Sequence, residues 1–311
     1  MMGRYLAITG GVGGAKLALG LSKLLGPDDV LFAVNTGDDF EHLGFDISPD
    51  VDTLTYTLAD EVNQDTGWGR AGESWQFIDA LAQFGGETWF RLGDRDLALH
   101  VTRTRLLAEG RTLTEATRTI TRALGIWHTL VPMSDDSVRT IVHTPDGPLA
   151  FQHYFVRDRC EPAVTGFEFQ GIDDAVPNPE ILACLRDCNA VIICPSNPFV
   201  SVDPMLDIPG MRDAIRASGA PVVAVSPIVG GLAIKGPTAK MMKELDVPAT
   251  AEQVATHYGD LLTGFLLDEQ DAGLHGALPV TTSVAHSVMH TLEDKIQLAR
   301  ATLRFVDTLK A

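Results

Sequence analysis

Four glycines in a five-residue stretch could bring the backbone close to a phosphate. Gly10, Gly11, Gly13 and Gly14 surround Val12, directly after an apolar run and before a run with helical spacing. Glycine adopts conformations closed to other residues and has no side chain to keep a ligand away. A helix N-terminus also offers free N–H groups and a positive dipole end. The stretch predicts a phosphate-binding turn, and a tight turn without a ligand is the alternative.

Because of Lys16, this turn matches neither of two common nucleotide-binding sequence patterns. The pattern G-x-G-x-x-G, counted from Gly11, would need a glycine where the chain has Lys16. The Walker pattern needs Gly-Lys-Ser/Thr, whereas Ala15 precedes and Leu17 follows the lysine. This mismatch makes a nicotinamide-dinucleotide oxidoreductase only the second interpretation of the sequence. Lys16 is counted among the residues predicted to bind the ligand.

Carboxylates gather in two segments that follow a second apolar run: Asn35-Thr36-Gly37-Asp38-Asp39 and Ser48-Pro49-Asp50-Val51-Asp52-Thr53. Ligands of open α/β sheets bind at the carboxyl ends of strands, and Mg²⁺ prefers oxygen ligands. Asp38, Asp39, Asp50 and Asp52 could thus hold Mg²⁺ together with a substrate phosphate. Asp50 and Asp52 could instead lie in the first turn of a helix as capping residues, and the spacing favours neither role.

Polar side chains in three further segments could contact a ligand. Asp94 and Arg95 in Gly93-Asp94-Arg95-Asp96 could clamp an anion or form a structural ion pair. Ser196, Asn197 and Pro198 follow one apolar run, and Ser226 follows the next. Both loops could read a base edge, or they could be ordinary turns. Trp75 and Phe77 lie near Trp68, and such aromatic side chains are more often core than ligand platform.

Alternating apolar runs and helical patterns must position these groups. Strands are expected at 5–9, 30–34, 190–194, 222–225 and 264–267. Helices are expected from Leu17 to Leu25 and at 50–58, 74–84, 97–109, 114–124, 209–217, 239–245, 251–262 and 292–309. This alternation predicts an α/β fold, a mostly parallel sheet with helices on both faces.

The middle of the chain departs from the alternation. A mainly helical insertion or cap is expected over about residues 50–135, within one α/β domain that spans 1–311. Pro145-Asp146-Gly147 lies between β-prone runs at 138–143 and 149–156, which predicts a β-hairpin.

Composition excludes several classes of function. The chain carries 24 basic and 41 acidic side chains, a formal charge of −17, which disfavours nucleic-acid binding. Glycines and prolines interrupt the apolar runs, so we expect no membrane span and no secretory signal. Cys160, Cys184, Cys188 and Cys194 are expected to be reduced thiols of a cytoplasmic protein rather than a zinc site.

Seven strings in order carry a resemblance to a known family: GGVGGAK at 10–16, NTGDD at 35–39, SPDVDT at 48–53, GWG at 67–69, LGDRDLA at 92–98, PSNP at 195–198 and SPIVGG at 226–231. The whole chain resembles the 2-phospho-L-lactate transferases of coenzyme F-420 biosynthesis. LGDRDLA and SPDVDT are the most specific of these strings.

The resemblance implies a Rossmann-like fold, a homodimer and a Mg²⁺-dependent reaction. Members of the family move a phospho-lactyl or phospho-enolpyruvyl group from a guanosine diphosphate conjugate to the ribityl hydroxyl of the deazaflavin Fo, and GMP is released. By this resemblance Gly11, Gly13 and Gly14 would cradle the diphosphate. Asp38 and Asp50, with Asp39 and Asp52, would hold Mg²⁺ or orient the hydroxyl, and Asp38 would contact Fo.

Further roles follow from the same resemblance. Ser196, Asn197 and the Ser226 loop would read guanine and ribose. The segment around Trp75 and Phe77 would face the deazaflavin, and Asp94 with Arg95 would close the site. A nucleotide-binding regulatory protein without turnover is a third interpretation, because gluconeogenesis-factor-like proteins share a similar glycine opening. LGDRDLA favours the transferase.

Overall fold

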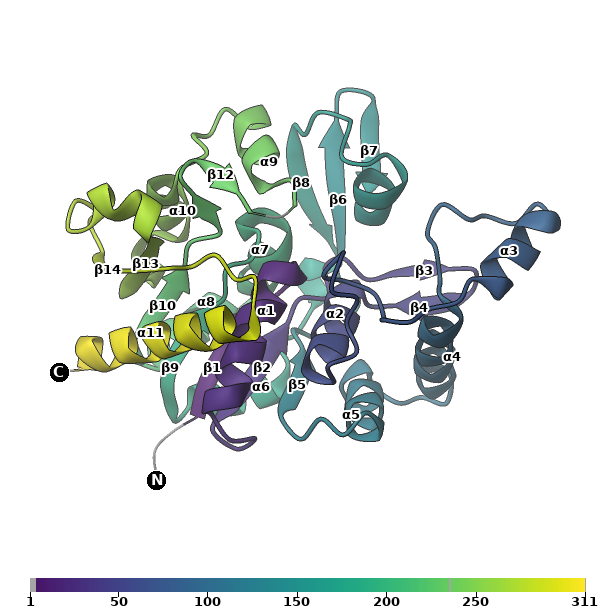
Figure 1. Cartoon of the computed structure of the whole chain (residues 1–311), viewed down its shortest axis with the longest axis horizontal. Coiled ribbons are helices and arrows are strands. Elements are labelled where there is room, and N and C mark those ends of the chain that lie inside the picture. The colour runs from purple at the N-terminus through teal and green to yellow at the C-terminus, as the bar shows by residue number, and fades with distance from the viewer. Residues whose placement is uncertain (1–3, 235, 311) are drawn as a thin grey trace.

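Seven parallel strands form the centre of the computed structural model, which describes residues 4–234 and 236–310 (Figure 1). The strand order is β14-β13-β10-β9-β1-β2-β5. These strands are β1 (Arg4–Thr9), β2 (Val30–Val34), β5 (Thr129–Pro132), β9 (Cys188–Ile193), β10 (Val222–Val225), β13 (Gly264–Asp268) and β14 (Thr281–Ala285). Each neighbouring pair is parallel, which confirms the predicted α/β class. The edge strands β5 and β14 were not expected from the sequence.

Helices cover both faces of this sheet, because side chains alternate between the faces along each strand. On one face, Ala7 and Phe32 pack with α1 (Gly11–Leu24) and α11 (Leu292–Lys310). On the other, Leu6 and Ile8 belong to a core that takes residues from α7 (Asp203–Leu206) and from four further helices. These are α6 (Pro179–Leu185), α8 (Met211–Ala217), α9 (Thr238–Glu244) and α10 (Ala251–Tyr258). The predicted two-sided covering is confirmed.

The segment between β2 and β5 is mainly helical. It contains α2 (Pro49–Leu58), α3 (Gln76–Gln83), α4 (Asp94–Ala108) and α5 (Leu113–Ala123), and α3 lies far from the sheet in Figure 1. A short hairpin of β3 (Phe40–His42) and β4 (Phe45–Ile47) precedes α2. The expected insertion, about 50–135, contains these four helices, but its last part is strand β5 of the main sheet.

The predicted hairpin is part of a three-stranded antiparallel sheet. Its strands are β6 (Arg139–Thr144), β7 (Gly147–Ala150) and β8 (Gly166–Gln170), in the order β7-β6-β8. The second strand, expected to reach residue 156, ends at Ala150, so that part of the prediction is wrong. A single π-helical turn, His153–Arg157, follows it and buries Tyr154 in the core.

Several short elements complete the fold. A π-helical turn at Pro198–Val202 leads into α7 (Asp203–Leu206), and β11 (Ile228–Val229) pairs with β12 (Leu232–Ala233). All four cysteines are free. Within residues 4–234 and 236–310, none of the helices has the length and apolar character needed to span a bilayer.

Candidate active site

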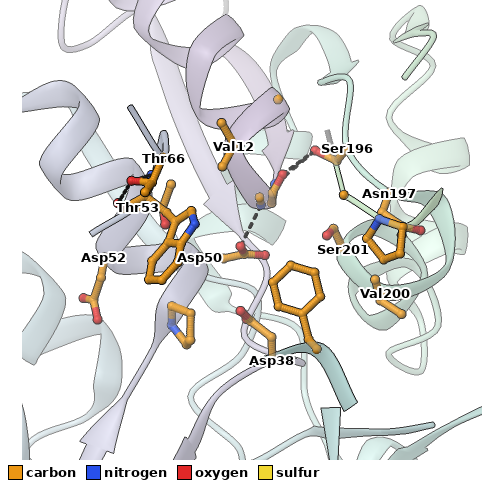
Figure 2. A pocket seen from close by; sticks show the side chains of 18 of the residues that line it. Val12, Asp38, Asp50, Asp52, Thr53, Thr66, Ser196, Asn197, Val200 and Ser201 are labelled. Atoms are coloured by element: carbon orange, nitrogen blue, oxygen red, sulfur yellow. Dashed lines mark hydrogen bonds between the residues drawn. The ribbon is translucent and has the colours of Figure 1, made fainter. Parts of the chain in front are cut away.

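A cavity of about 300 Å³ opens where β1, β2, β9 and β10 end (Figure 2). Segments from many places in the sequence line it. They include the glycine turn, Asp38, helix α2, the loop after β9 and Ser226 after β10. This is the position that the sheet rule predicts for a ligand, because the carboxyl ends of parallel strands meet at one edge.

The glycine turn is the first turn of α1 rather than a loop before it. Gly11 begins the helix with φ +63°, and its N–H donates to Asp50 Oδ1 at 2.7 Å. A Cβ at Gly13 would lie 2.3 Å from the carbonyl oxygen of Pro195, and one at Gly14 would lie 2.4 Å from Thr9 Oγ1. Close packing therefore accounts for two of the glycines, and Gly10, Gly11 and Gly13 line the cavity, whereas Gly14 does not.

Asp38 and Asp50 are buried and are joined through one amide. Asn35 Nδ2 donates to Asp38 Oδ1 at 3.3 Å and to Asp50 Oδ2 at 2.9 Å. Burial raises the pKa of Asp50 to about 6, although hydrogen bonds from Asn35 and Gly11 oppose this. Burial and the charge of Asp50 raise the pKa of Asp38 well above its ordinary value. Figure 2 shows both side chains at the centre of the pocket.

This pair suits a divalent cation better than the four-carboxylate set that the sequence suggested. Two buried carboxylates with raised pKa values gain most from a positive partner, and Mg²⁺ is commonly held by one or two carboxylates plus substrate phosphate. Asp39 accepts a hydrogen bond from Ser48 at 2.7 Å and does not line the cavity. Across the residues that the structure describes, no group of three or more acidic, His or Cys side chains is arranged for a metal.

Asp52 lines the cavity but is committed to Arg103. The guanidinium reaches both carboxylate oxygens, with Nη1 3.1 Å from Oδ2 and Nη2 on Oδ1. Both side chains are buried, and His100 Nδ1 lies 3.7 Å from Asp52 Oδ2. A buried aspartate with this partner stabilises the junction of α2 and α4 and has little free capacity for a metal.

The loops after β9 and β10 combine turn hydrogen bonds with cavity lining. Ser196 Oγ donates to the carbonyl of Gly10 at 2.8 Å, and Asn197 Oδ1 accepts from the N–H of Phe199 at 3.0 Å. Ser226 Oγ accepts from the N–H of Ile228 at 3.2 Å. All three line the cavity, whereas Pro198 does not. Turn chemistry and ligand contact, the two readings that the sequence left open, are compatible here.

Lys16 also reaches the cavity. Its Nζ donates to the carbonyl oxygen of Met289 at 2.7 Å, and both residues line the pocket. This contact fixes the ammonium beside the first turn of α1, where a cation complements a bound anion.

Besides Gly14, Asp39 and Pro198, four more residues singled out from the sequence do not line the cavity: Trp75, Phe77, Asp94 and Arg95. Asp94 instead accepts hydrogen bonds from the N–H groups of Gln76 and Phe77, at 3.1 and 3.0 Å, and so caps α3. The guanidinium of Arg91 lies 4.2 Å from the ring centre of Trp75. The roles that the resemblance gave these residues stay predictions.

Four aromatic side chains for which the sequence predicted no ligand contact line the cavity, whereas Trp75 and Phe77, which were expected to face the ligand, do not. We call Trp68, Phe90, Phe151 and Phe155 the aromatic wall, since all four line the cavity. Trp68 belongs to the GWG string, for which the sequence predicted no ligand contact. Phe151 and Phe155 lie where a strand was expected, so only the turn after β7 directs them inward.

The lining of the cavity thus combines two chemically different sets of residues. One set is the glycine turn, Lys16, Asp38 and Asp50, and the other is the aromatic wall. The first suits a phosphoanhydride with a divalent cation, and the second suits a flat ring. Such a site can hold a phosphorylated group and an aromatic alcohol side by side.

Comparisons with known proteins agree with this geometry. The family described as "2-phospho-L-lactate transferase CofD" matches residues 6–301. A protein named phosphoenolpyruvate transferase from Kitasatospora aureofaciens is 37% identical over 317 residues, covering 99% of each chain. One of the same name from Streptomyces griseus is 39% identical over 276 residues, covering 87% of each. A 2-phospho-L-lactate transferase from Methanosarcina mazei is 33% identical over 302 residues, covering 96% of this chain and 99% of that one.

A solved structure matches the fold alone. A protein of the UPF0052 family from Bacillus halodurans superposes with a TM-score of 0.64 at 16% identity, covering 97% of this chain and 99% of that one. At this identity the match supports the arrangement of strands and helices and says nothing about substrates.

Proposed function

Because this chain belongs to the 2-phospho-L-lactate transferase CofD family, we propose that it transfers a three-carbon phospho-acid group from a guanosine diphosphate conjugate to the deazaflavin Fo. The hydroxyl oxygen of the Fo ribityl chain attacks the phosphorus that carries the acid. The bond from that phosphorus to the GMP leaving group breaks. The product is a phosphodiester that serves as a coenzyme F-420 precursor.

The two sets of residues that line the cavity support this pairing of substrates. The diphosphate of the donor would lie at the first turn of α1, where Gly13 would supply an N–H group and Lys16 a positive charge. The guanosine would extend toward Ser196, Asn197 and Ser226. The deazaflavin ring would lie on the aromatic wall, whose faces offer stacking area.

Asp38 and Asp50 would act where the two substrates meet. The attacked phosphorus is negatively charged throughout, so catalysis depends on positioning and charge neutralisation. Mg²⁺ bound by this pair would neutralise charge on the phosphoryl oxygens. Asp38 would accept a hydrogen bond from the attacking hydroxyl and orient it, and Asn35 would hold both carboxylates in place. Through its hydrogen bond to the N–H of Gly11, Asp50 would hold the N-terminus of α1, and the diphosphate bound there, next to the attacking hydroxyl.

Enolpyruvate is the acid that we propose for the donor. The relatives named phosphoenolpyruvate transferase are more similar in sequence to this chain than the Methanosarcina relative named for phospholactate. The homodimer and the cytoplasmic location implied by the resemblance stay predictions.

One observation carries the proposal: a buried pair, Asp38 and Asp50, lines the same cavity as a glycine turn at a helix N-terminus and an aromatic wall, in a chain of a transferase family. The test incubates the protein with Fo, Mg²⁺ and either the enolpyruvyl or the lactyl guanosine diphosphate, and follows GMP and the phosphodiester by mass spectrometry. We expect product mainly with the enolpyruvyl donor. No product from either donor, with GDP binding intact by calorimetry, would favour the regulatory protein; hydride transfer to or from a nicotinamide cofactor would favour the oxidoreductase.

A further inference from the structure

The two aspartates of Gly93-Asp94-Arg95-Asp96 have different surroundings. Asp94 starts α4 and caps α3, outside the cavity. Asp96 lies two residues further along α4 and lines the cavity. Helical spacing places it over His100, four residues on, which also lines the cavity. The member of this string that can meet a ligand is therefore Asp96.

Two side chains hold the carboxylate of Asp96 from behind. Tyr56 Oη donates to Oδ1 at 2.6 Å, and His100 Nε2 lies 3.3 Å from Oδ2. The side chain of Asp96 is 15% exposed, whereas that of His100 is 2% exposed. His100 Nε2 is buried and makes no hydrogen bond of good geometry. Oδ2 receives no hydrogen bond from His100, so it keeps the capacity to accept one from a ligand in the cavity that Asp96 lines.

The charge around Asp96 favours its ionised form. Burial would raise the pKa of this carboxyl, but His100, the Tyr56 hydroxyl and the charge of Arg103 together lower it below the ordinary value. An ionised carboxylate can only accept hydrogen bonds, and its bonds to N–H or O–H donors are strong. The cavity thus presents a fixed acceptor at this point.

Asp96 shares the cavity with two members of the aromatic wall, Trp68 and Phe90. Its partner Tyr56 also lines the cavity and belongs to α2, six residues after Asp50. A flat substrate on the aromatic wall would therefore have the Asp96 carboxylate in the same lining.

We propose that Asp96 determines specificity for the acceptor: its carboxylate accepts a hydrogen bond from an N–H or O–H group on the ring of the flat substrate. Tyr56 and His100 are positioning residues that fix the carboxylate. The proposal rests on the proposed function, since it assigns the aromatic wall to the acceptor. It gives a role to a carboxylate that Tyr56 supports beside aromatic side chains of the cavity.

Replacing Asp96 by Asn tests this inference without changing size. We expect Asp96→Asn to raise both the KM and the calorimetric Kd for Fo about tenfold or more, because a charge-assisted hydrogen bond is lost. The Kd for GDP and the KM for the donor should not change. Tyr56→Phe should move the Fo constants in the same direction by a smaller factor, since the carboxylate stays but loses one support. Glu109→Gln removes a carboxylate at the exposed end of α4 and is the control.

Analogues of Fo with the ring N–H or O–H methylated make the test specific. The wild-type protein should bind one of these methylated analogues more weakly than it binds Fo. The Asp96→Asn variant should bind that analogue and Fo with equal affinity. Product formation by wild type with an unchanged Fo constant in Asp96→Asn would overturn this inference and leave the proposed function standing. A fall in kcat alone, or a lowered melting temperature in both variants, would show a merely structural role. Failure of wild type to bind Fo at all would overturn both proposals.

Discussion

The N–H of Gly11 donates a 2.7 Å hydrogen bond to Oδ1 of Asp50. The first N–H of α1, which the sequence assigned to a phosphate, is therefore directed at a carboxylate of α2. A phosphate and this carboxylate are both attracted to the same helix end. In the proposed function, Asp50 would link the bound nucleotide to the reaction centre, and its charge would oppose nucleotide binding in the absence of a cation.

Replacing Asp50 by Asn separates these two effects. The amide oxygen can still accept from Gly11, but the negative charge is gone. We expect Asp50→Asn to bind GDP more tightly than wild type without Mg²⁺, by about threefold to tenfold, since like-charge repulsion near a phosphate is removed. The gain in GDP affinity that Mg²⁺ gives wild type should disappear, and product formation should be lost. Calorimetry with and without Mg²⁺ measures this; an unchanged response to Mg²⁺ would argue against Asp50 as a ligand.

Asp38→Asn should stabilise the metal-free protein and abolish transfer. Asp38 and Asp50 are buried next to each other, and burial with mutual repulsion raises the pKa of Asp38. Removing one charge relieves that repulsion, so we expect the melting temperature at pH 8 without Mg²⁺ to rise by about 2–4 °C. Scanning calorimetry beside an activity assay checks both parts. A lower melting temperature would mean that Asp38 supports the fold rather than the reaction.

Gly13→Ala should weaken the packing of α1 against the loop after β9. The new Cβ would lie 2.3 Å from the carbonyl oxygen of Pro195, so the helix or the loop must move. We expect a loss of about 1–3 kcal/mol in the free energy of unfolding, together with weaker GDP binding. Urea denaturation and calorimetry measure the two effects. Gly273→Ala is the matched control, because nothing lies within 4 Å of its Cβ position.

Arg103→Met should be strongly destabilising. The change leaves Asp52 buried without its cation, which costs about 3–5 kcal/mol. Adding Asp52→Asn should recover more than half of that loss, because the unpaired charge is then removed. Urea denaturation of the single and double variants gives the coupling energy. Equal losses in the single and double variants would show that packing of the Arg103 stem, rather than the ion pair, stabilises α2 against α4.

Trp68→Ala should impair Fo binding through lost stacking area. We expect at least a tenfold rise in the KM for Fo with the donor KM unchanged, since an aromatic contact of this kind contributes about 1–3 kcal/mol. Trp127→Ala is the control: Trp127 is also exposed, and it stacks with Arg122 away from the cavity. Steady-state kinetics with varied Fo compares the two. Equal effects of both replacements would exclude Trp68 from the acceptor site.

The sequence predicted the buried parts of the sheet and missed its edges. The apolar runs of β1, β2, β9, β10 and β13 are continuous, as expected for strands covered on both faces. The edge strands are short or polar: β5 ends in Pro132, and β14 contains Thr281, Thr282 and Ser283. Neither has the apolar continuity that marks a central strand, so their pairing depends on the neighbours.

The site was predictable where it follows strand ends and unpredictable where it depends on loop paths. Ser196 and Ser226 directly follow β9 and β10, and both line the cavity. Trp75 and Trp68 are close in sequence, yet only the course of the chain between α2 and α3 decides that Trp68 faces inward. For Asp96 a local signal existed: Gly93 precedes a helix, and helical spacing puts Asp96 on the face of His100.

The pairing of β1 with β9 has a consequence for synthesis of the chain. Leu6 lies beside Val191, so the interior strand β1 lacks one of its two neighbours until a much later part of the chain has been synthesised. Ser196, which bonds Gly10, emerges later still. An amino-terminal fragment that ends before β9 therefore lacks part of the proposed nucleotide site. GDP binding should therefore appear during translation only after the β9 segment has left the exit tunnel, which makes the ligand a reporter of completed assembly.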